Sequence, residues 1–340
     1  MLFDSQRNKS NIALLFGGVV LGSILIYTTG KISAHLSFKK ADVRVTIKSI
    51  LERVQRDECE RGISAFKGND PLVLEKAAAA LTKGGKVVVI LTGFPALINH
   101  VPPTETDGPP GAFSIAKACI HIGKRVIMVT DDCNANVMMA CTAGCGLKGS
   151  DFSLDSFPSS EKWDKSDEAR LIKLSQKADI VVAIERPGPA KDGRYYTMKG
   201  LDMGKLVAPV DKLLKYVKSK GNEVPVIAIG DGGNEVGMGN VRSKIIEKSA
   251  IKFAPKVSCC LCSDHLIVCS VSNWGGYALA GALAALHLSD NKILNTTSVI
   301  KAMLPSELEE RMLLERMVES GARDGITGEK AMSIDGLPFE

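Results

Sequence analysis

Carboxylates, amides and glycines recur in this 340-residue sequence directly after short apolar runs. Such runs are typical of buried strands, and in an open parallel sheet ligands bind beyond the carboxyl ends of the strands. Residues that follow different strands would therefore converge on one cleft. The residues in question are Thr92, Gly93, Glu105, Asp107, Glu185, Arg186, Asp231, Gly232, Gly233, Asn234, Glu235 and Asn273.

The string GDGGNEVGMGN from Gly230 is close to a dinucleotide-binding fingerprint, but Glu235 stands in place of the third glycine of G-x-G-x-x-G. The charges of Asp231 and Glu235 would repel phosphates, so we expect no nucleotide cofactor. An acidic loop suits a divalent cation, Mn²⁺ or Mg²⁺, or a substrate ammonium. Its glycine N–H groups could hold a small carboxylate.

Each of these residues also has a plain structural alternative. Asp and Asn after a strand are often helix N-caps or turn residues, and glycines there often only form turns. The coincidence of five such strand ends favours the functional interpretation.

Elements that alternate along the chain must position these residues. Apolar runs predict strands at 86–91, 125–129, 180–184, 224–229 and 266–270. Helical spacing predicts helices at 42–67, 71–81, 112–122, 135–141, 167–177, 210–220, 277–287 and 305–320. The polar segment 150–167 is expected to be a loop. The pattern predicts an α/β fold with a mostly parallel sheet flanked by helices.

The composition excludes some classes of protein. A net charge of +5 without a basic stripe, and only 5% aromatic residues, argue against a nucleic-acid partner. The nine cysteines are an odd number, which favours free thiols in a reducing compartment.

An uncharged stretch precedes the predicted α/β region. Residues 11–30 are long and apolar enough for one transmembrane helix, with a cleaved signal peptide as the alternative. We therefore divide the chain into a tail and membrane anchor (1–40) and a catalytic domain (41–340). One such span predicts a single-pass membrane protein. The excess of Lys and Arg after the span predicts that the catalytic domain faces the mitochondrial matrix or the cytosol.

The longest of these strings resemble the D-glutamate cyclase family. They are LTGFPALINHVPPTETDGPPGA from Leu91, VTDD from Val129, ERPG from Glu185, YYTMKGLDMG from Tyr195 and GDGGNEVGMGN from Gly230. The resemblance extends from about Asp42 to Gly336. It implies a lyase that converts D-glutamate into 5-oxo-D-proline and water, in a mitochondrial setting in animal members.

That chemistry assigns expected roles. The substrate ammonium must lose a proton to a carboxylate, so Glu185, Asp231 and Glu235 are the catalytic candidates. A cation on the γ-carboxyl would make it a better electrophile, and its expected ligands are Glu105, Asp107, Asp231 and Glu235, with Glu185 as a second candidate.

The expected substrate-binding residues are Thr92, Gly93, Arg186, Arg194, Gly232, Gly233, Asn234 and Asn273. Arg186 or Arg194 would bind the α-carboxylate of D-glutamate as a bidentate partner. The alternative for Arg186 is a salt bridge with a neighbouring acid.

Two other functions remain open from the residues alone. The acidic loops could serve a metal-dependent hydrolase such as a phosphatase, or a membrane-tethered domain that binds a ligand without turnover. The sequence does not indicate an oligomeric state.

Overall fold

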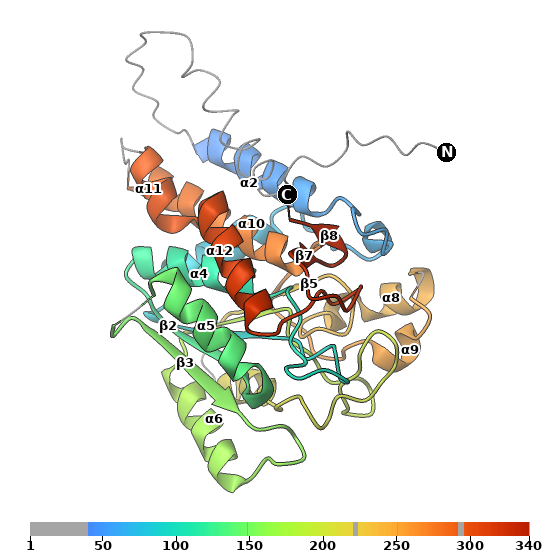
Figure 1. The fold of residues 1–340 in the computed structure, drawn as a ribbon. Helices are drawn as coiled ribbons and strands as arrows, with labels where there is room; N and C mark the ends of the chain where they lie inside the picture. Colours follow the sequence, from blue (N-terminus) through green and yellow to red (C-terminus); the bar gives the residue numbers. More distant parts are fainter. Residues whose placement is uncertain (1–39, 148, 220–223, 250, 292–295, 340) are drawn as a thin grey trace.

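Six strands form one parallel sheet in the order β3-β2-β1-β4-β5-β6 (Figure 1). The computed structural model describes residues 40–339 except 148, 220–223, 250 and 292–295. The strands are β1 (Val87–Thr92), β2 (Arg125–Asp131), β3 (Phe152–Phe157), β4 (Ile180–Ile184), β5 (Val226–Gly230) and β6 (His265–Val268). The expected α/β fold with a mostly parallel sheet is confirmed.

The strand order reverses between β1 and β4, which pair side by side although two other strands separate them in sequence. In doubly wound sheets the crevice for ligands opens at this switch point, because the connections on its two sides diverge to opposite faces. The carboxyl ends of β1 and β4 are therefore the expected place for a site.

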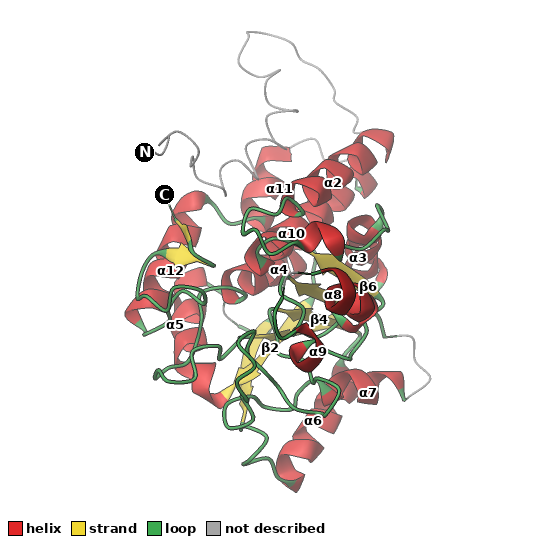
Figure 2. Cartoon of the chain, turned by 90° about the vertical axis from the view of Figure 1, so that its right-hand side faces the viewer, coloured by secondary structure: helices red, strands yellow, loops and turns green. Residues whose placement is uncertain are grey.

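Helices cover both faces of the sheet (Figure 2). One face packs against α3 (Val73–Lys83), α4 (Pro109–His121), α5 (Ala135–Cys145) and α10 (Ser272–Asp290). Helices α2 (Lys40–Val54), α11 (Thr296–Met303) and α12 (Glu307–Glu319) pack in turn on these four helices. The other face packs against α6 (Lys165–Lys177) and α7 (Lys212–Lys218), and α8 (Arg242–Lys248) and α9 (Ala254–Val257) enclose a smaller core beside β5 and β6. Because both faces are buried, the central strands β1, β4 and β5 are almost continuously apolar rather than alternating.

Helices α4 and α10 approach each other closely at their N-terminal ends. A Cβ added to Gly276 would lie 2.5 Å from the Cα of Gly111, and one added to Gly111 would lie 2.9 Å from the Cα of Asn273. Only glycine permits such a backbone-to-backbone contact. The contact brings the N-termini of both helices to the carboxyl ends of the central strands.

The structure corrects two expectations. Residues 150–167 are not one loop: 152–157 form the edge strand β3, which pairs only with β2 and so needs no continuous apolar run, and Asp164 then caps α6. The helix expected over 42–67 ends at Val54, because Asp57 receives the N–H groups of Arg61 and Gly62 and turns the chain.

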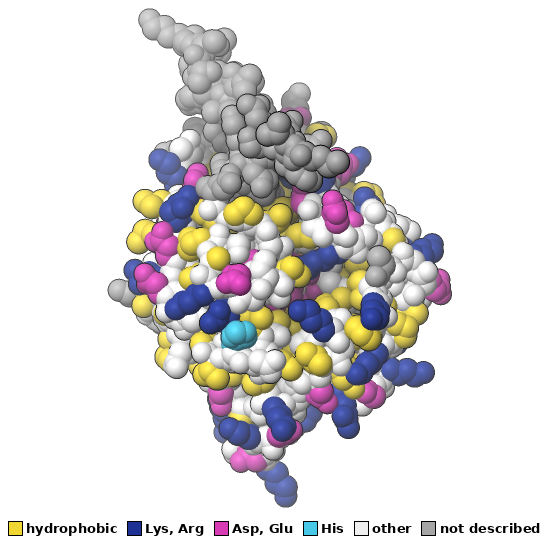
Figure 3. Space-filling view, turned by 45° about the vertical axis from the view of Figure 1, so that its right-hand side comes forward, with side chains coloured by type: hydrophobic (Ala, Val, Ile, Leu, Met, Phe, Trp, Pro, Cys, Tyr) yellow, Lys and Arg dark blue, Asp and Glu magenta, His cyan; other side chains and the backbone are white. Residues whose placement is uncertain are grey.

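The expected membrane span at 11–30 lies outside the described residues. Among the residues that are described, no helix combines the length and the hydropathy that a bilayer crossing requires. All nine cysteines are described, and all nine are free thiols. On the face shown in Figure 3, basic and acidic side chains are interspersed.

Helix α12 carries a buried carboxyl, Glu310, which accepts a hydrogen bond of 2.6 Å from the hydroxyl of Tyr277 on α10. Burial raises the pKa of Glu310 from its usual 4.5 to about 8. The neutral carboxyl therefore supports the fold fully below about pH 4.5, and this support is lost as the pH rises through 8.

We expect the variant Glu310→Gln to gain stability relative to the wild-type protein as the pH rises from 5 to 9, by about 1.4 kcal/mol for each pH unit between the two pKa values. Urea unfolding of both proteins at the two pH values measures the difference, with the exposed neighbour Glu307→Gln as control. A difference that stays constant with pH would contradict the assignment.

Candidate active site

Three carboxylates meet at the carboxyl end of the sheet beside the switch point. Glu185 follows β4, Asp231 follows β5, and Asp107 lies in the connection from β1 to α4. One oxygen of each lies within 4.8 Å of the other two, and all three side chains are buried. We call these three residues the acidic cluster.

The N-terminus of α10 points at the acidic cluster. The backbone N–H of Ser272 donates to Asp107 Oδ2 at 2.8 Å and to Asp231 Oδ2 at 3.1 Å, and the N–H of Asn273 donates to Asp107 Oδ1 at 2.7 Å. The hydroxyl of Ser272 donates to Glu185 Oε2 at 2.5 Å. These free N–H groups and the positive end of the helix dipole stabilise negative charge here.

Asn273 on α10 in turn binds the N-terminal end of α4. Its side-chain oxygen accepts the N–H groups of Gly108 and Gly111, both at 2.9 Å, and its amide donates to the carbonyl of Thr106 at 3.2 Å. Asn273, a predicted substrate-binding residue, thus has its side chain occupied by the first turn of α4. Gly108 has φ of 100°, and a Cβ there would lie 2.7 Å from the Cβ of Glu185.

The acidic cluster retains protons. Burial, together with the carboxylates of Glu235 and Asp107, raises the pKa of Glu185 well above its usual range. Burial also raises the pKa of Asp231 well above its usual range, although Arg61 opposes it. The pKa of Asp107 is raised by burial despite hydrogen bonds with Asp231 and the α10 N–H groups. Neighbouring carboxyls that cannot all ionise can both accept and donate protons.

Glu105 lies close to the acidic cluster but is not part of it. Burial and the charges of Asp335 and Asp107 raise the pKa of Glu105 well above its usual range. Its oxygens are not among those that lie within 4.8 Å of one another, so the structure gives the expected metal role of Glu105 no support.

One arginine reaches the acidic cluster. Arg61 forms ion pairs with Asp231 and with Asp335, which lies 2.8 Å from its second guanidinium nitrogen. Asp335 is in the turn of the hairpin formed by β7 (Ser333–Ile334) and β8 (Leu337–Pro338). Burial opposes the positive charge, but Asp231 and Asp335 outweigh it and raise the pKa of Arg61. Burial and Asp107 raise the pKa of Asp335 to about 7.

The glycine-rich loop binds a carboxylate of its own chain. Glu235 accepts the backbone N–H groups of Asp231, Gly232 and Gly233 at 3.1, 2.6 and 2.5 Å. The backbone N–H groups of Gly232 and Gly233, which could have held a substrate carboxylate, are therefore occupied by Glu235. The amide of Asn234 donates to the carbonyl of Tyr196 and so fixes the loop to the segment after β4.

Arg186 forms the salt bridge that the sequence allowed as its alternative role. Its guanidinium donates to both oxygens of Asp131 at 2.6 and 2.7 Å and to the carbonyls of Ala208 and Gly93, and both side chains of the ion pair are fully buried. This pair joins the ends of β2 and β4. Binding of a substrate carboxylate by Arg186 remains a prediction that this geometry does not favour.

The end of β1 leaves a polar atom without a partner. Thr92 is fully buried, and its hydroxyl has no hydrogen-bond partner among the residues that the structure describes. A Cβ at Gly108 would contact both Glu185 and this hydroxyl, so Thr92 lies beside the acidic cluster. An orphaned buried hydroxyl next to carboxylates is suited to a hydrogen bond with a ligand. The neighbouring Gly93, with φ of 96°, turns the chain at this point.

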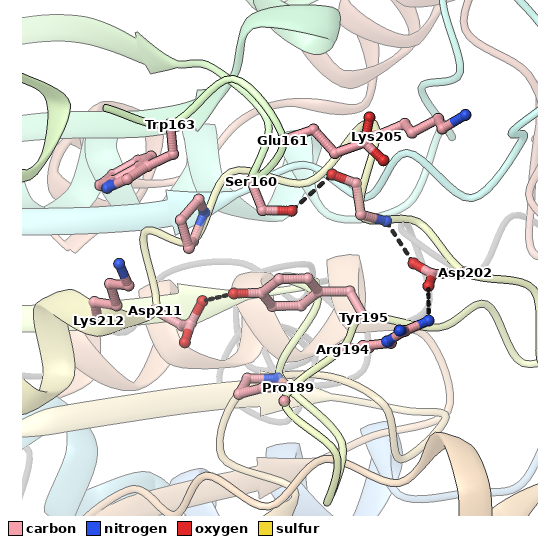
Figure 4. Close-up of a pocket in the computed structure, with 13 residues that line it drawn as sticks. Ser160, Glu161, Trp163, Pro189, Arg194, Tyr195, Asp202, Lys205, Asp211 and Lys212 are labelled. Carbon is pink, nitrogen blue, oxygen red and sulfur yellow. Dashed lines mark hydrogen bonds and ion pairs between the residues drawn. The ribbon is translucent and has the colours of Figure 1, made fainter. Parts of the chain in front are cut away.

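Arg194 lies elsewhere, at an open pocket of about 720 Å³ between the β3–α6 connection and the segment before α7 (Figure 4). Its exposed guanidinium pairs with Asp202 at 3.1 Å, and Tyr195 in the same pocket donates to Asp211 at 2.5 Å. None of the carboxylates of the acidic cluster lines this pocket. The structure therefore does not bring Arg194 together with the predicted catalytic residues.

A divalent cation would find its ligands in the acidic cluster, which contains part of the expected set together with the second candidate, Glu185. Two oxygens within 4.8 Å of each other can share one ion at the distances that Mg²⁺, Mn²⁺ or Ca²⁺ prefer. Asp107 and Asp231 belong to the predicted set, whereas both oxygens of Glu235 are bonded to backbone. Glu185 takes the place of Glu235 and Glu105.

Sequence reasoning missed Arg61, Ser272 and Asp335. Arg61 lies inside a segment that helical spacing alone suggested to be regular helix, and Asp335 belongs to a terminal turn. Only Ser272 had a usable sequence pattern, since Ser and Asn directly before an apolar helix are typical of a helix N-terminus.

Comparisons with known proteins found a matching family model and a similar curated protein. A family model described as D-glutamate cyclase-like, C-terminal, matches residues 50–340. The human protein named D-glutamate cyclase, mitochondrial, is 31% identical over 329 residues, which cover 90% of this chain. The chain spans about half the length of this curated relative (51%).

The pairing of Arg186 with Asp131 yields a test of their structural role. We expect Asp131→Asn to lower the free energy of unfolding by about 3–5 kcal/mol, because the guanidinium would remain buried without a counter-charge. The exposed pair Arg194–Asp202 supplies the control, since Asp202→Asn should cost at most about 1 kcal/mol. Denaturant unfolding measures both, and equal small losses would show that the buried pair is not a structural support.

Proposed function

The chain belongs to the D-glutamate cyclase-like family, and from this premise we propose that it converts D-glutamate into 5-oxo-D-proline and water. The observation that carries the proposal is the acidic cluster: three buried carboxyls that are close enough to share protons and lie at the switch point of the sheet. Such a group can take a proton from an amine and give one to a leaving oxygen.

The reaction requires proton movement in both directions. The substrate nitrogen starts as an ammonium, loses two protons in all, and forms a bond to the γ-carbon. One γ-carboxyl oxygen breaks its bond to that carbon and leaves as water with two protons. The net charge of the substrate does not change, so the site only has to carry protons from nitrogen to oxygen.

We assign the base role to Asp231 and the acid role to Glu185. Asp231 is paired with Arg61 and receives the Ser272 N–H, and both interactions favour its ionised form. Glu185 has no cationic partner among the described residues, and its pKa is raised further by Glu235 and Asp107, which favours its protonated form. Two carboxyls whose surroundings separate their protonation states are typical of acid–base pairs.

Asp107 and Thr92 supply binding and orientation in this proposal. Asp107 shares a hydrogen bond with Asp231 and belongs to the same acidic cluster. It would therefore accept a second hydrogen bond from the substrate ammonium. The free hydroxyl of Thr92 beside Glu185 would hold the γ-carboxyl. Holding both ends of the folded substrate lowers the barrier to an intramolecular attack. A divalent cation held by the acidic cluster would act as a Lewis acid on the γ-carboxyl.

A mitochondrial location is also part of the proposal, because the human relative carries that word in its name. Nine free thiols suit the reducing matrix. The membrane tether at 11–30 remains a prediction from sequence.

To test the reaction, the 340-residue chain is incubated with D-glutamate or L-glutamate, with Mn²⁺ or with EDTA, and 5-oxoproline is measured by chiral chromatography. We expect product from D-glutamate, and its loss in EDTA would assign a metal to the acidic cluster. No product from either enantiomer would overturn the proposal; phosphate release from an aryl phosphate would then indicate a hydrolase, and binding of D-glutamate alone a binding domain.

Replacement of the acid and the base should separate chemistry from folding. We expect Asp231→Asn and Glu185→Gln each to lower kcat at least about 100-fold, the usual contribution of a positioned acid or base. The melting temperature of Glu185→Gln should not fall, because the replacement removes a buried carboxyl that has no cationic partner among the described residues. In Asp231→Asn the guanidinium of Arg61 keeps Asp335 as its counter-charge, so we expect only a small loss of stability. Glu52→Gln, on the exposed face of α2, is the control that should retain full activity. Full activity in either site variant would remove that residue from the assignment.

A further inference from the structure

Arg61 reaches the acidic cluster from a backbone that is fixed in place. Asp57 accepts the N–H groups of Arg61 and Gly62 at 2.9 and 2.7 Å, and Gly62 has φ of 77°, so the chain turns sharply there. The guanidinium is then held by Asp231 on one side and by Asp335 on the other.

Among the described Arg and Lys residues, Arg61 alone forms an ion pair with a member of the acidic cluster. Its side chain keeps 19% of its surface exposed, while those of Asp231 and Asp335 keep 3% and 5%. Of these three side chains, that of Arg61 is therefore the most exposed to solvent.

An α-amino acid carries an ammonium and a carboxylate on the same carbon atom. A site for this head group needs an anion and a cation side by side, within a hydrogen bond of each other. Asp231 and Arg61 form such a neighbouring pair, and the unpartnered hydroxyl of buried Thr92 lies close by beside Glu185. The internal ion pair satisfies both groups while no ligand is bound.

We propose that Arg61 and Asp231 together form the head-group site, in which Asp231 receives the substrate ammonium and Arg61 turns from Asp231 to bind the α-carboxylate. The inference rests on the proposed function, since it names the residues that recognise the amino acid at the same site. A planar guanidinium can pair with a carboxylate through two parallel hydrogen bonds, which a lysine cannot reproduce.

Asp335 acts on Arg61 as a positioning residue. It holds the second guanidinium nitrogen at 2.8 Å, so Arg61 can leave Asp231 and stay anchored over the site. Arg186 and Arg194 are less suited to this role: the first is fully buried against Asp131, and the second lies at a pocket that no acidic-cluster residue lines.

The test measures binding by calorimetry, independently of turnover, for D-glutamate and for 4-aminobutyrate, which is glutamate without its α-carboxylate. We expect Arg61→Gln to weaken D-glutamate binding about 10- to 100-fold, as for the loss of a charged hydrogen bond. Binding of 4-aminobutyrate should change less than about threefold, and Arg61→Lys should recover only part of the loss. Asp335→Asn should raise KM for D-glutamate while changing kcat little.

Arg53→Gln is the matched control, because Arg53 lies in the last turn of α2 and, within the described part of the chain, forms an ion pair only with Glu58, at 3.8 Å. The inference would be overturned if Arg61→Gln lost affinity for both ligands equally, or lost no affinity for D-glutamate. A wild-type chain that binds neither ligand would overturn it as well. A wild-type chain that binds D-glutamate through Arg61 but forms no 5-oxoproline would support the head-group site and reject the proposed function. If Arg61→Gln fails to fold, the KM of Asp335→Asn decides.

Discussion

The site depends on a reciprocal contact between the N-termini of α4 and α10. Asp107, just before α4, accepts two N–H groups of α10, and Asn273, in the first turn of α10, accepts two N–H groups of α4. Each helix thus satisfies donors that the other would leave free. The glycine contact between Gly111 and Gly276 permits the approach. The contact holds Asp107 beside Glu185 and Asp231, which the sheet already places next to each other.

This arrangement explains how the carboxyls of Asp107, Glu185 and Asp231 can be buried together. Burial disfavours charge, and helix N–H groups with one guanidinium only partly offset it, so the pKa values stay raised. The cluster therefore keeps protons at a pH where exposed carboxyls have none. The property that makes the site costly to fold is the one that suits proton transfer.

The charged residues around the site divide by function. Glu235 and the pair Arg186–Asp131 hold loops and strand ends, because their carboxylate oxygens and the terminal guanidinium nitrogens are bonded within the protein. Arg61 and Asp335 come from near the two ends of the described chain and meet over the acidic cluster. The site is consequently complete only when the terminal segments have docked onto the α/β core.

The sequence by itself determined the α/β class, the central strands and the carboxylates that follow β4 and β5, because these depend on local hydrophobic patterning and on the rule that ligands bind at strand ends. Its motifs also indicated the family. The sequence could not determine which carboxylates form the acidic cluster: Glu235 folds back onto its own loop, whereas Asp107 meets Asp231. It likewise missed Arg61, which lies 170 positions from Asp231 in the chain. Such partners are brought together by packing over long sequence distances, and no local pattern of residue types records them.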